Sequence, residues 1–202
     1  MSIKNVIFDY GQVMIHFTPS YMVGQYVTDP TDAALLTEVV FDRLYWNRLD
    51  AGTISDEEVL SACCERLPNR LWESARTIYY NWIYHIPPIE GMAELVTYLR
   101  EQYGIGLYLL SNISCYFADH REEMPSLSLF DGCVLSGPIG MVKPDLAIYV
   151  HLCDTYHLCP EESVFIDDCT GNIEAAEAYG IHGYLFDGDV AKLRAYLDEI
   201  LK

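Results

Sequence analysis

Apolar and polar residues are grouped along the chain in blocks that predict strands and helices in alternation. The predicted strands are short apolar runs bounded by polar or glycine residues, at positions 4–8, 106–110, 132–135 and 163–166. Between them, apolar residues recur at helical spacing, as in residues 91–102, 147–157 and 172–179. This alternation predicts an α/β fold with a doubly wound parallel sheet.

Residues 16–86 interrupt the alternation, because this stretch has helical and aromatic patterns throughout and no convincing strand. An S-x-x-E capping box that begins at Ser55 predicts the start of one of its helices. Pro87 marks the end of the helical stretch and the start of the next part of the sheet domain, since proline ends helices and favours extended structure before it. We therefore predict a helical cap over residues 16–86, inserted into an α/β core formed by residues 1–15 and 87–202.

Polar side chains follow every predicted strand, either directly or after a short turn. In chain order they are Asp9, then Ser111 with Asn112, then Lys143, and last Asp167 with Asp168. The ligand crevice of a doubly wound sheet lies outside the carboxyl ends of its strands, so these groups should converge although they are far apart in sequence. Two or three carboxylates, a hydroxyl, an amide and one ammonium group would then share a site.

Such a set of groups predicts a divalent metal beside an oxyanion site. Clustered carboxylates repel one another unless a cation neutralises them, and hard oxygen ligands favour Mg²⁺. Lys143 would supply a point charge for a phosphate. Side chains alternate faces along a strand, so only one of Asp167 and Asp168 should be a direct ligand if the strand continues to them.

The composition narrows the class of partner. The chain has 202 residues, 51% of them apolar, which suffices for one core with a modest insertion. Acidic residues outnumber basic ones by 30 to 12, and the net charge of −18 argues against binding of nucleic acid or of an anionic membrane surface. A small anionic substrate is compatible with this charge, because a metal ion and a lysine can reverse the local field.

Seven scattered cysteines without paired C-x-x-C spacing predict reduced thiols and a cytoplasmic protein. The sequence shows neither the pattern of a signal peptide nor a stretch of about 20 apolar residues that would span a membrane. Whether the protein is a monomer or a homodimer stays open.

Four motifs at the strand ends resemble those of the haloacid dehalogenase-like hydrolases, in particular their small phosphatase branch with a helical cap. The motifs lie at residues 6–13, 110–112, 142–145 and 165–168, the last followed by Asn172. Each is short, but their order and spacing extend over nearly the whole chain and include the inserted helices. The likeness is greatest to bacterial sugar-phosphate phosphatases with an F-D-x-G-x-V opening, which act on compounds such as glucose 1-phosphate.

This resemblance implies a nucleophile and a metal site. Asp9 would be the nucleophile and a metal ligand, Asp168 a second carboxylate ligand, and the backbone carbonyl of Gly11 a third ligand. Asp167 and Asn172 would order water bound to the metal. Attack by a carboxylate would divide hydrolysis into two steps through an aspartyl phosphate, with Mg²⁺ stabilising the charge on the transferring group.

The resemblance also implies a phosphate site. Ser111 and Lys143 would bind the phosphoryl group, and Asn112 would lie beside it. Lys143 would act in catalysis as well, because its charge stabilises the transferring group. The implied activity is that of a Mg²⁺-dependent phosphomonoesterase that acts on a small phosphorylated metabolite such as a sugar phosphate.

One departure from the family pattern stands two residues after Asp9. Most phosphatases of the family have a second aspartate there, which protonates the leaving group and then activates water, whereas this chain has Gly11. Gln12 cannot replace it, because an amide has no proton to give at neutral pH. Two alternatives stay open: a metal-free 2-haloacid dehalogenase, against which the adjacent aspartates at 167 and 168 argue, and a catalytically silent protein that binds phosphate or a partner.

In the predicted cap, the loop at residues 50–52 is a candidate to face the site, because a cap must close over it somewhere. The cap aromatics are expected to pack between helices rather than to form a substrate platform. They are Tyr45, Trp46, Trp72, Tyr79, Tyr80 and Trp82.

Overall fold

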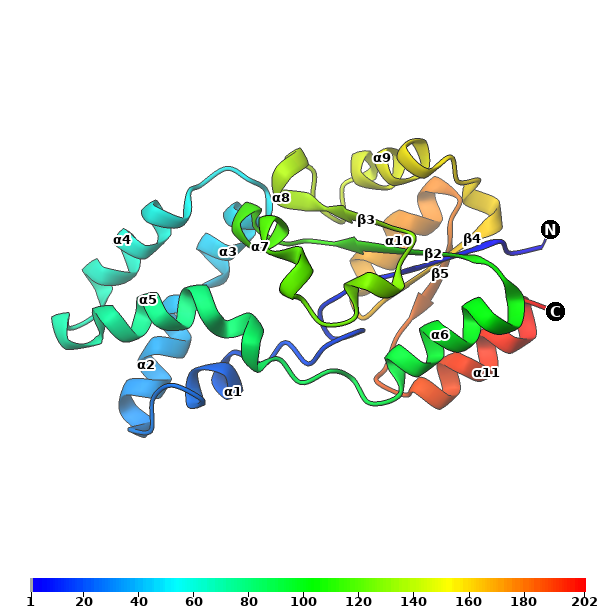
Figure 1. Cartoon of the computed structure of the whole chain (residues 1–202). Helices are drawn as coiled ribbons and strands as arrows, with labels where there is room; N and C mark the ends of the chain where they lie inside the picture. Colours follow the sequence, from blue (N-terminus) through cyan, green and yellow to red (C-terminus); the bar gives the residue numbers. More distant parts are fainter. Residues whose placement is uncertain (1) are drawn as a thin grey trace.

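Five parallel strands form one sheet with the order β3-β2-β1-β4-β5 (Figure 1). The structure, a computed structural model, describes residues 2–202, so the first residue of the predicted core lies outside the described part. The strands are β1 (Asn5–Phe8), β2 (Gly106–Ser111), β3 (Gly132–Leu135), β4 (Ser163–Asp167) and β5 (His182–Leu185). The chain moves outward from β1 to β3 and then returns to the other side of β1. This is a doubly wound sheet, and the predicted fold class is confirmed.

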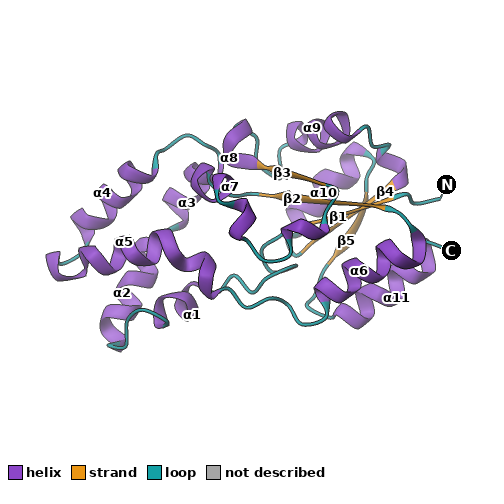
Figure 2. Cartoon of the chain, viewed as in Figure 1, coloured by secondary structure: helices purple, strands orange, loops and turns teal. Residues whose placement is uncertain are grey.

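Helices cover both faces of the sheet (Figure 2). They are α6 (Met92–Tyr103) and α11 (Val190–Ile200) on one face, and α9 (Leu146–Tyr156) and α10 (Thr170–Tyr179) on the other. The alternation of side chains in β1 matches this division. Val6 and Phe8 belong to the core beneath α6 and α11, whereas Ile7 packs with α9 and α10. Both faces of the central strand are buried, which explains its continuous apolar run.

The sequence patterns missed β5, the edge strand that pairs with β4. Its four residues are exposed or half-buried and include His182 and Gly183, so no apolar run marks it. The structure also extends two strands by one residue beyond their predicted ends, to Ser111 in β2 and to Asp167 in β4. The second extension decides where the side chain of Asp167 points.

Of the six α-helices between β1 and β2 in sequence, the first five lie beyond the carboxyl ends of the strands (Figure 1). They are α1 (Pro19–Gly24), α2 (Pro30–Val40), α3 (Arg43–Asp50), α4 (Asp56–Arg66) and α5 (Trp72–Asn81), with 3₁₀ turns at Asn69–Leu71 and Trp82–His85. We take them as the cap. The predicted capping box is confirmed at the start of α4, where the N–H of Glu58 donates to Ser55 Oγ at 3.2 Å and the N–H of Ser55 donates to Glu58 Oε2 at 2.9 Å.

Aromatic side chains fill the interior of the cap. Trp46 stacks on Phe41 with ring centroids 5.0 Å apart, and Trp82 meets Phe117 edge-on at 4.6 Å. Phe117 belongs to α7 (Cys115–Asp119), a short helix that follows β2, so the same cluster joins the cap to the core. Trp46, Tyr79 and Trp82 are buried and pack between helices, as expected. The expectation is wrong for Trp72, which is 42% exposed, and incomplete for Trp46 and Trp82, which also line the cavity at the strand ends.

The end of α3 is fixed to the core by a close approach of two backbones. Gly52 has φ +64°, and a Cβ at this position would lie 2.4 Å from the carbonyl oxygen of Gly137. Beside it, Ser136 Oγ donates to the carbonyl of Asp50 at 2.6 Å and accepts from the N–H of Ile113 at 2.9 Å. Cap and core are thus joined next to the strand ends, at a contact that a glycine permits.

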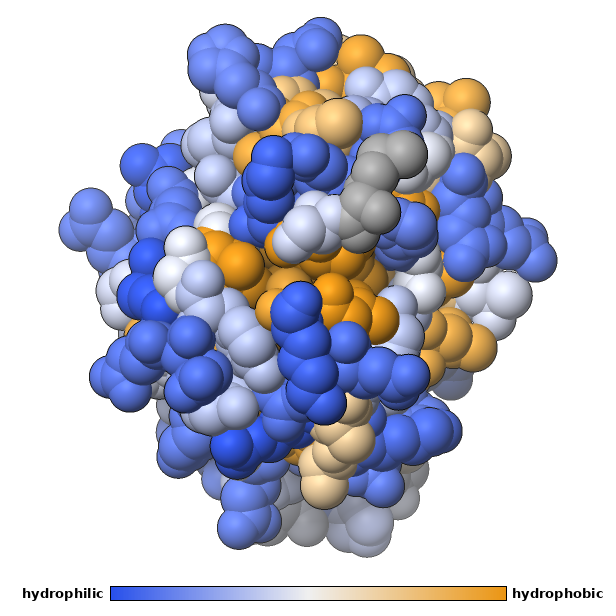
Figure 3. All heavy atoms as spheres, turned by 90° about the vertical axis from the view of Figure 1, so that its right-hand side faces the viewer, coloured by the Kyte–Doolittle hydropathy of each residue, from blue (hydrophilic) through white to orange (hydrophobic). Residues whose placement is uncertain are grey.

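The end of the molecule away from the cap, where both termini lie, is largely hydrophilic (Figure 3). A small apolar area near its centre is surrounded by hydrophilic side chains, which is ordinary for a protein surface. Within residues 2–202, every helix is too short or too polar to cross a bilayer.

Replacing Gly52 by alanine should destabilise the protein by about 2–3 kcal/mol, because a backbone clash adds to the strain of a left-handed residue. The matched control is Gly104→Ala, at a site with φ +62° and nothing within 4 Å of the new Cβ. Gly104→Ala should lower the free energy of unfolding by about 1 kcal/mol, because it adds only the strain of a left-handed alanine. Urea unfolding of both variants measures the difference. Equal losses would show that the contact between Gly52 and Gly137 is loose in solution.

Candidate active site

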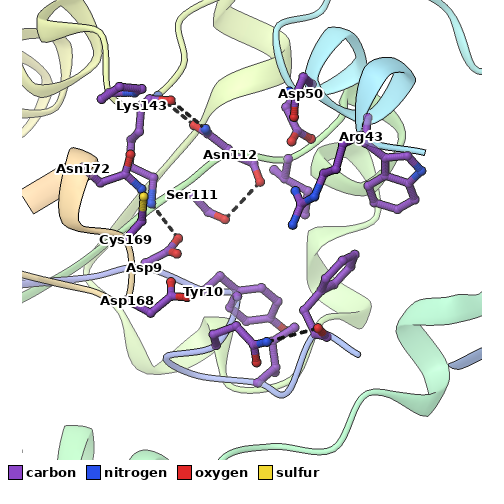
Figure 4. A pocket seen from close by; sticks show the side chains of 18 of the residues that line it. Asp9, Tyr10, Arg43, Asp50, Ser111, Asn112, Lys143, Asp168, Cys169 and Asn172 are labelled. Atoms are coloured by element: carbon purple, nitrogen blue, oxygen red, sulfur yellow. Dashed lines mark hydrogen bonds and ion pairs between the residues drawn. The ribbon is translucent and has the colours of Figure 1, made fainter. Parts of the chain in front are cut away.

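A cavity of about 510 Å³ lies between the carboxyl ends of the strands and the cap (Figure 4). Seven of the residues predicted for the site line it: Asp9, Gly11, Ser111, Asn112, Lys143, Asp168 and Asn172. The four strand ends therefore converge on one cavity. Asp167 differs from the others, because it is fully buried behind the cavity wall.

Lys143 lies between two carboxylates. Its Nζ is 2.7 Å from Oδ1 of Asp9 and 2.7 Å from Oδ2 of Asp167. The lysine side chain is only 1% exposed, so its charge depends on these partners rather than on water. The backbone of Asp9 is fixed as well, since its N–H donates to the carbonyl of Ile166 in β4 at 2.9 Å. The predicted nucleophile is thus held at both backbone and side chain.

Both carboxylate oxygens of Asp167 are engaged by hydrogen bonds from other residues of the protein. Its Oδ1 accepts from the N–H of Cys169 at 2.8 Å, and Asn172 Nδ2 lies 3.1 Å and 3.0 Å from its two oxygens. Because β4 includes Asp167, the alternation of side chains directs it to the same face as Phe165, toward α10. Asp168 follows the strand and is exposed to the cavity. The two adjacent aspartates therefore have different surroundings.

Asn112 pairs with the backbone of Lys143. Its Nδ2 donates to the Lys143 carbonyl at 3.0 Å, and its Oδ1 accepts from the Lys143 N–H at 2.8 Å. This double hydrogen bond fixes the loop that carries the lysine. Ser111, at the end of β2, is buried and lines the cavity beside it.

Burial shifts the protonation equilibria of the charged groups. Desolvation raises the pKa of Asp9 to about 7; Lys143 opposes this shift and Asp167 adds to it. Desolvation, together with Asp167, also raises the pKa of Asp168. Burial alone would lower the pKa of Lys143, but its two carboxylate partners outweigh that effect and raise it. Three carboxylates thus lie close together with one lysine, which pairs with only Asp9 and Asp167, and the site favours an additional positive charge.

The carboxylates can act as ligands for a cation that brings this positive charge. Asp9, Asp167 and Asp168 each offer an oxygen, and the three oxygens lie within 4.8 Å of one another. Hard oxygen donors suit Mg²⁺, and a cation here would relieve the unfavourable burial of the Asp9 charge. Because the protein already engages both oxygens of Asp167, Asp9 and Asp168 are the better placed ligands.

Comparisons with known proteins agree with this geometry. A sequence profile of the haloacid dehalogenase-like hydrolases matches residues 4–180. The chain belongs to this family. A sesquiterpene phosphatase of Aspergillus oryzae is 26% identical over 183 residues, which are 89% of this chain and 88% of that protein. A D-ribitol-5-phosphate phosphatase of Bacteroides thetaiotaomicron is 23% identical over 193 residues, 90% of this chain and 91% of that protein.

A solved structure has the same fold. It is a haloacid dehalogenase family enzyme of Bacteroides thetaiotaomicron, a variant in complex with magnesium and inorganic phosphate, with a TM-score of 0.69 at 20% identity over 95% of this chain and 99% of that chain. This haloacid dehalogenase-like hydrolase is accordingly a phosphatase, as predicted. Phosphatases of the family use Mg²⁺, and the carboxylate cluster provides the ligands that it prefers, so the predicted cofactor is confirmed.

The cap contributes cavity residues that the sequence did not identify as a group. Arg43, Asn47 and Asp50 follow one another at i, i+4 and i+7 on α3, so they lie on one face, and all three line the cavity. Figure 4 shows Arg43 and Asp50 directed into it. Phe17 and Trp82 form an apolar wall on the same side. The helical spacing was readable in the sequence, but the face of α3 that meets the strand ends was not.

Replacing Lys143 by methionine should destabilise the protein by about 3–5 kcal/mol, because it leaves two buried carboxylates without their partner. The control is Lys4→Met, which breaks an ion pair of the same 2.7 Å length to Glu162, but with a lysine that is 63% exposed. That change should cost at most about 1 kcal/mol. Denaturant unfolding without added metal gives both values; similar losses would contradict the structural role of the buried pair.

Proposed function

We propose that this hydrolase removes the phosphoryl group from a small phosphorylated metabolite, with Asp9 as the nucleophile. The observation that carries this proposal is the position of the Asp9 carboxylate, held at the end of β1 by Lys143 and open to the cavity. A carboxylate in this position can attack phosphorus, release the alcohol and form an aspartyl phosphate. Attack by water on phosphorus then regenerates Asp9 and releases phosphate.

The residues around Asp9 support these two steps. Lys143 would bind an oxygen of the phosphoryl group, since its ammonium has a third proton beyond those given to Asp9 and Asp167. Ser111 would donate its hydroxyl proton to another oxygen. Asn112 would act chiefly by holding Lys143, because its side-chain amide is engaged there.

The metal would be held by Asp9, Asp168 and the carbonyl of Gly11. Within residues 2–202 no donor hydrogen-bonds to that carbonyl, so it is free for a cation. Bound Mg²⁺ would neutralise charge on the phosphoryl oxygens. Asp167 and Asn172 would order water near the metal only through the hydrogen-bonding capacity left by their mutual contacts.

We propose a sugar or polyol phosphate as the substrate. Arg43 and Asn47 present polar groups to the cavity, which suit hydroxyl groups, and Phe17 and Trp82 offer an apolar wall for the C–H face of a sugar. The cavity of about 510 Å³ accommodates a compound of this size. Free thiols at all seven cysteines are consistent with the predicted cytoplasmic location, which remains part of the proposal.

The two alternatives are less well supported. A metal-free dehalogenase would have little use for three carboxylates within 4.8 Å of one another. A silent binding protein would not need a carboxylate whose side chain is held open to the phosphate position by a buried lysine. Assays of phosphate and halide release distinguish both alternatives from a phosphatase.

Asp9→Asn should reduce the hydrolysis of p-nitrophenyl phosphate by about 10³-fold or more, because an amide cannot form the aspartyl phosphate. Excess EDTA should abolish the wild-type activity, and added Mg²⁺ should restore it. The control is Asp187→Asn at an exposed surface carboxylate, which should leave the rate unchanged. Activity that persists in Asp9→Asn would remove the nucleophile from the proposal, and chelator-resistant activity would remove the metal.

Sugar and polyol phosphates should be hydrolysed with a kcat/KM at least about 10-fold above that of farnesyl phosphate, and 2-chloropropionate should not react. The reason is that hydroxyl groups find partners in Arg43 and Asn47, whereas a prenyl chain would leave both unpaired. Phosphate release and halide release measure the two reactions. A preference for the prenyl ester would assign the cavity to apolar substrates, and halide release would favour the dehalogenase.

A further inference from the structure

The glycine at position 11 leaves the strand end without a side chain to protonate a departing alcohol. Two other proton-bearing groups of the cavity wall are poor substitutes. An arginine guanidinium does not act as a general acid, which excludes Arg43. The hydroxyl of Tyr10 donates to the carbonyl of Pro125 at 3.1 Å, and burial raises the pKa of Tyr10 above its ordinary value. A proton donor must therefore come from elsewhere in the cavity.

Asp50 is the acidic residue that the cap directs into this space. It is the last residue of α3, it lines the cavity, and Figure 4 shows its carboxyl group projecting from the cap toward the strand ends. Its position is fixed from the core, since Ser136 Oγ donates to the Asp50 carbonyl at 2.6 Å and Gly52 packs against Gly137. The hydrogen bonds of the described chain leave its carboxyl group without a side-chain partner, so it is available to a substrate.

The surroundings of Asp50 suit a group that both gives and takes a proton. Desolvation raises its pKa to about 7. Among the charged groups that face it, Arg43 on the same helix lowers the pKa, Asp9 at the end of β1 raises it, and Lys143 lowers it. A carboxyl group near neutrality is populated in both forms at physiological pH, which is the condition for acid–base catalysis.

We propose that Asp50, from the cap, is the general acid and base that the core lacks at Gly11. When Asp9 attacks phosphorus and the ester P–O bond breaks, the Asp50 carboxyl group gives its proton to the departing oxygen, which leaves as an alcohol. The Asp50 carboxylate then takes a proton from the water that attacks the aspartyl phosphate, and the bond between phosphorus and Asp9 breaks. Asp50 ends the cycle protonated, as it began. The inference rests on the proposed function.

The test compares substrates whose leaving groups differ in their need for a proton. In Asp50→Asn, cleavage of an alkyl phosphate such as ribitol 5-phosphate should slow by about 10²- to 10³-fold in single turnover. Release of p-nitrophenolate, which needs little protonation, should slow less than about 10-fold in the first turnover. The second step also lacks its base, so p-nitrophenolate should appear as a burst of one equivalent followed by slow turnover.

The pH profile gives an independent readout. In wild type with saturating Mg²⁺, which favours the ionised form of Asp9, kcat/KM for the alkyl phosphate should fall as the pH rises through about 7, because the acid Asp50 loses its proton. This descending limb of the pH profile should be absent in Asp50→Asn and present in Asp50→Glu, which restores a carboxyl group. Asn47→Ala, one turn earlier on the same helix, should raise KM without a burst and without altering the limb.

The outcomes separate the inference from the function on which it rests. If wild type hydrolyses phosphate esters through Asp9, but Asp50→Asn slows alkyl and aryl substrates equally and keeps the pH limb, the acid–base role is wrong. The role is also wrong if Cys169→Ser, which alters a thiol of the cavity wall, shows the burst instead. If wild type hydrolyses no phosphate ester, the proposed function itself fails.

Discussion

The buried ammonium of Lys143 is the interaction on which the rest of the site depends. It touches Asp9 and Asp167 at 2.7 Å each, and its charge has almost no access to water. A lysine so deeply buried stays charged only because two carboxylates surround it. The two carboxylates in turn stay close together only because the lysine charge offsets their mutual repulsion. Asn112 hydrogen-bonds to the backbone of Lys143, and Asn172 donates a hydrogen bond to the carboxylate of Asp167. The network orients Asp9 before any substrate or metal arrives.

The fold provides this network through the parallel sheet. Reversal of strand order beside β1 brings the ends of β1 and β4 together, so Asp9 lies next to Asp167 although the two are 158 positions apart. The alternation along β4 then gives its two aspartates different roles: Asp167 turns toward α10 and the lysine, while Asp168 faces the cavity. One carboxylate is structural and the next is free for a cation.

Much of this could be predicted from the sequence, because strand ends of a doubly wound sheet are known to converge and the polar residues there are conspicuous. The partners of each group could not be predicted. The motif placed Asn112 beside the phosphate, but its amide binds the peptide of Lys143, and such a contact depends on the path of a loop. The edge strand β5 was missed since its residues are half exposed. Arg43 and Asn47 were missed because helical periodicity does not reveal which face a tertiary contact will cover.

The position of the cap also changes the mechanistic consequence of having a glycine at position 11. In a core that carries its own acid, the cap needs only to exclude water and select the substrate. Here the group best placed to transfer a proton, Asp50, lies on the helix that also carries Arg43 and Asn47. Substrate contacts and proton transfer would then depend on the same docking of α3 against Ser136 and Gly137. A poorly fitting substrate that displaced α3 would also displace the acid, so selectivity would be expressed in kcat as well as in KM.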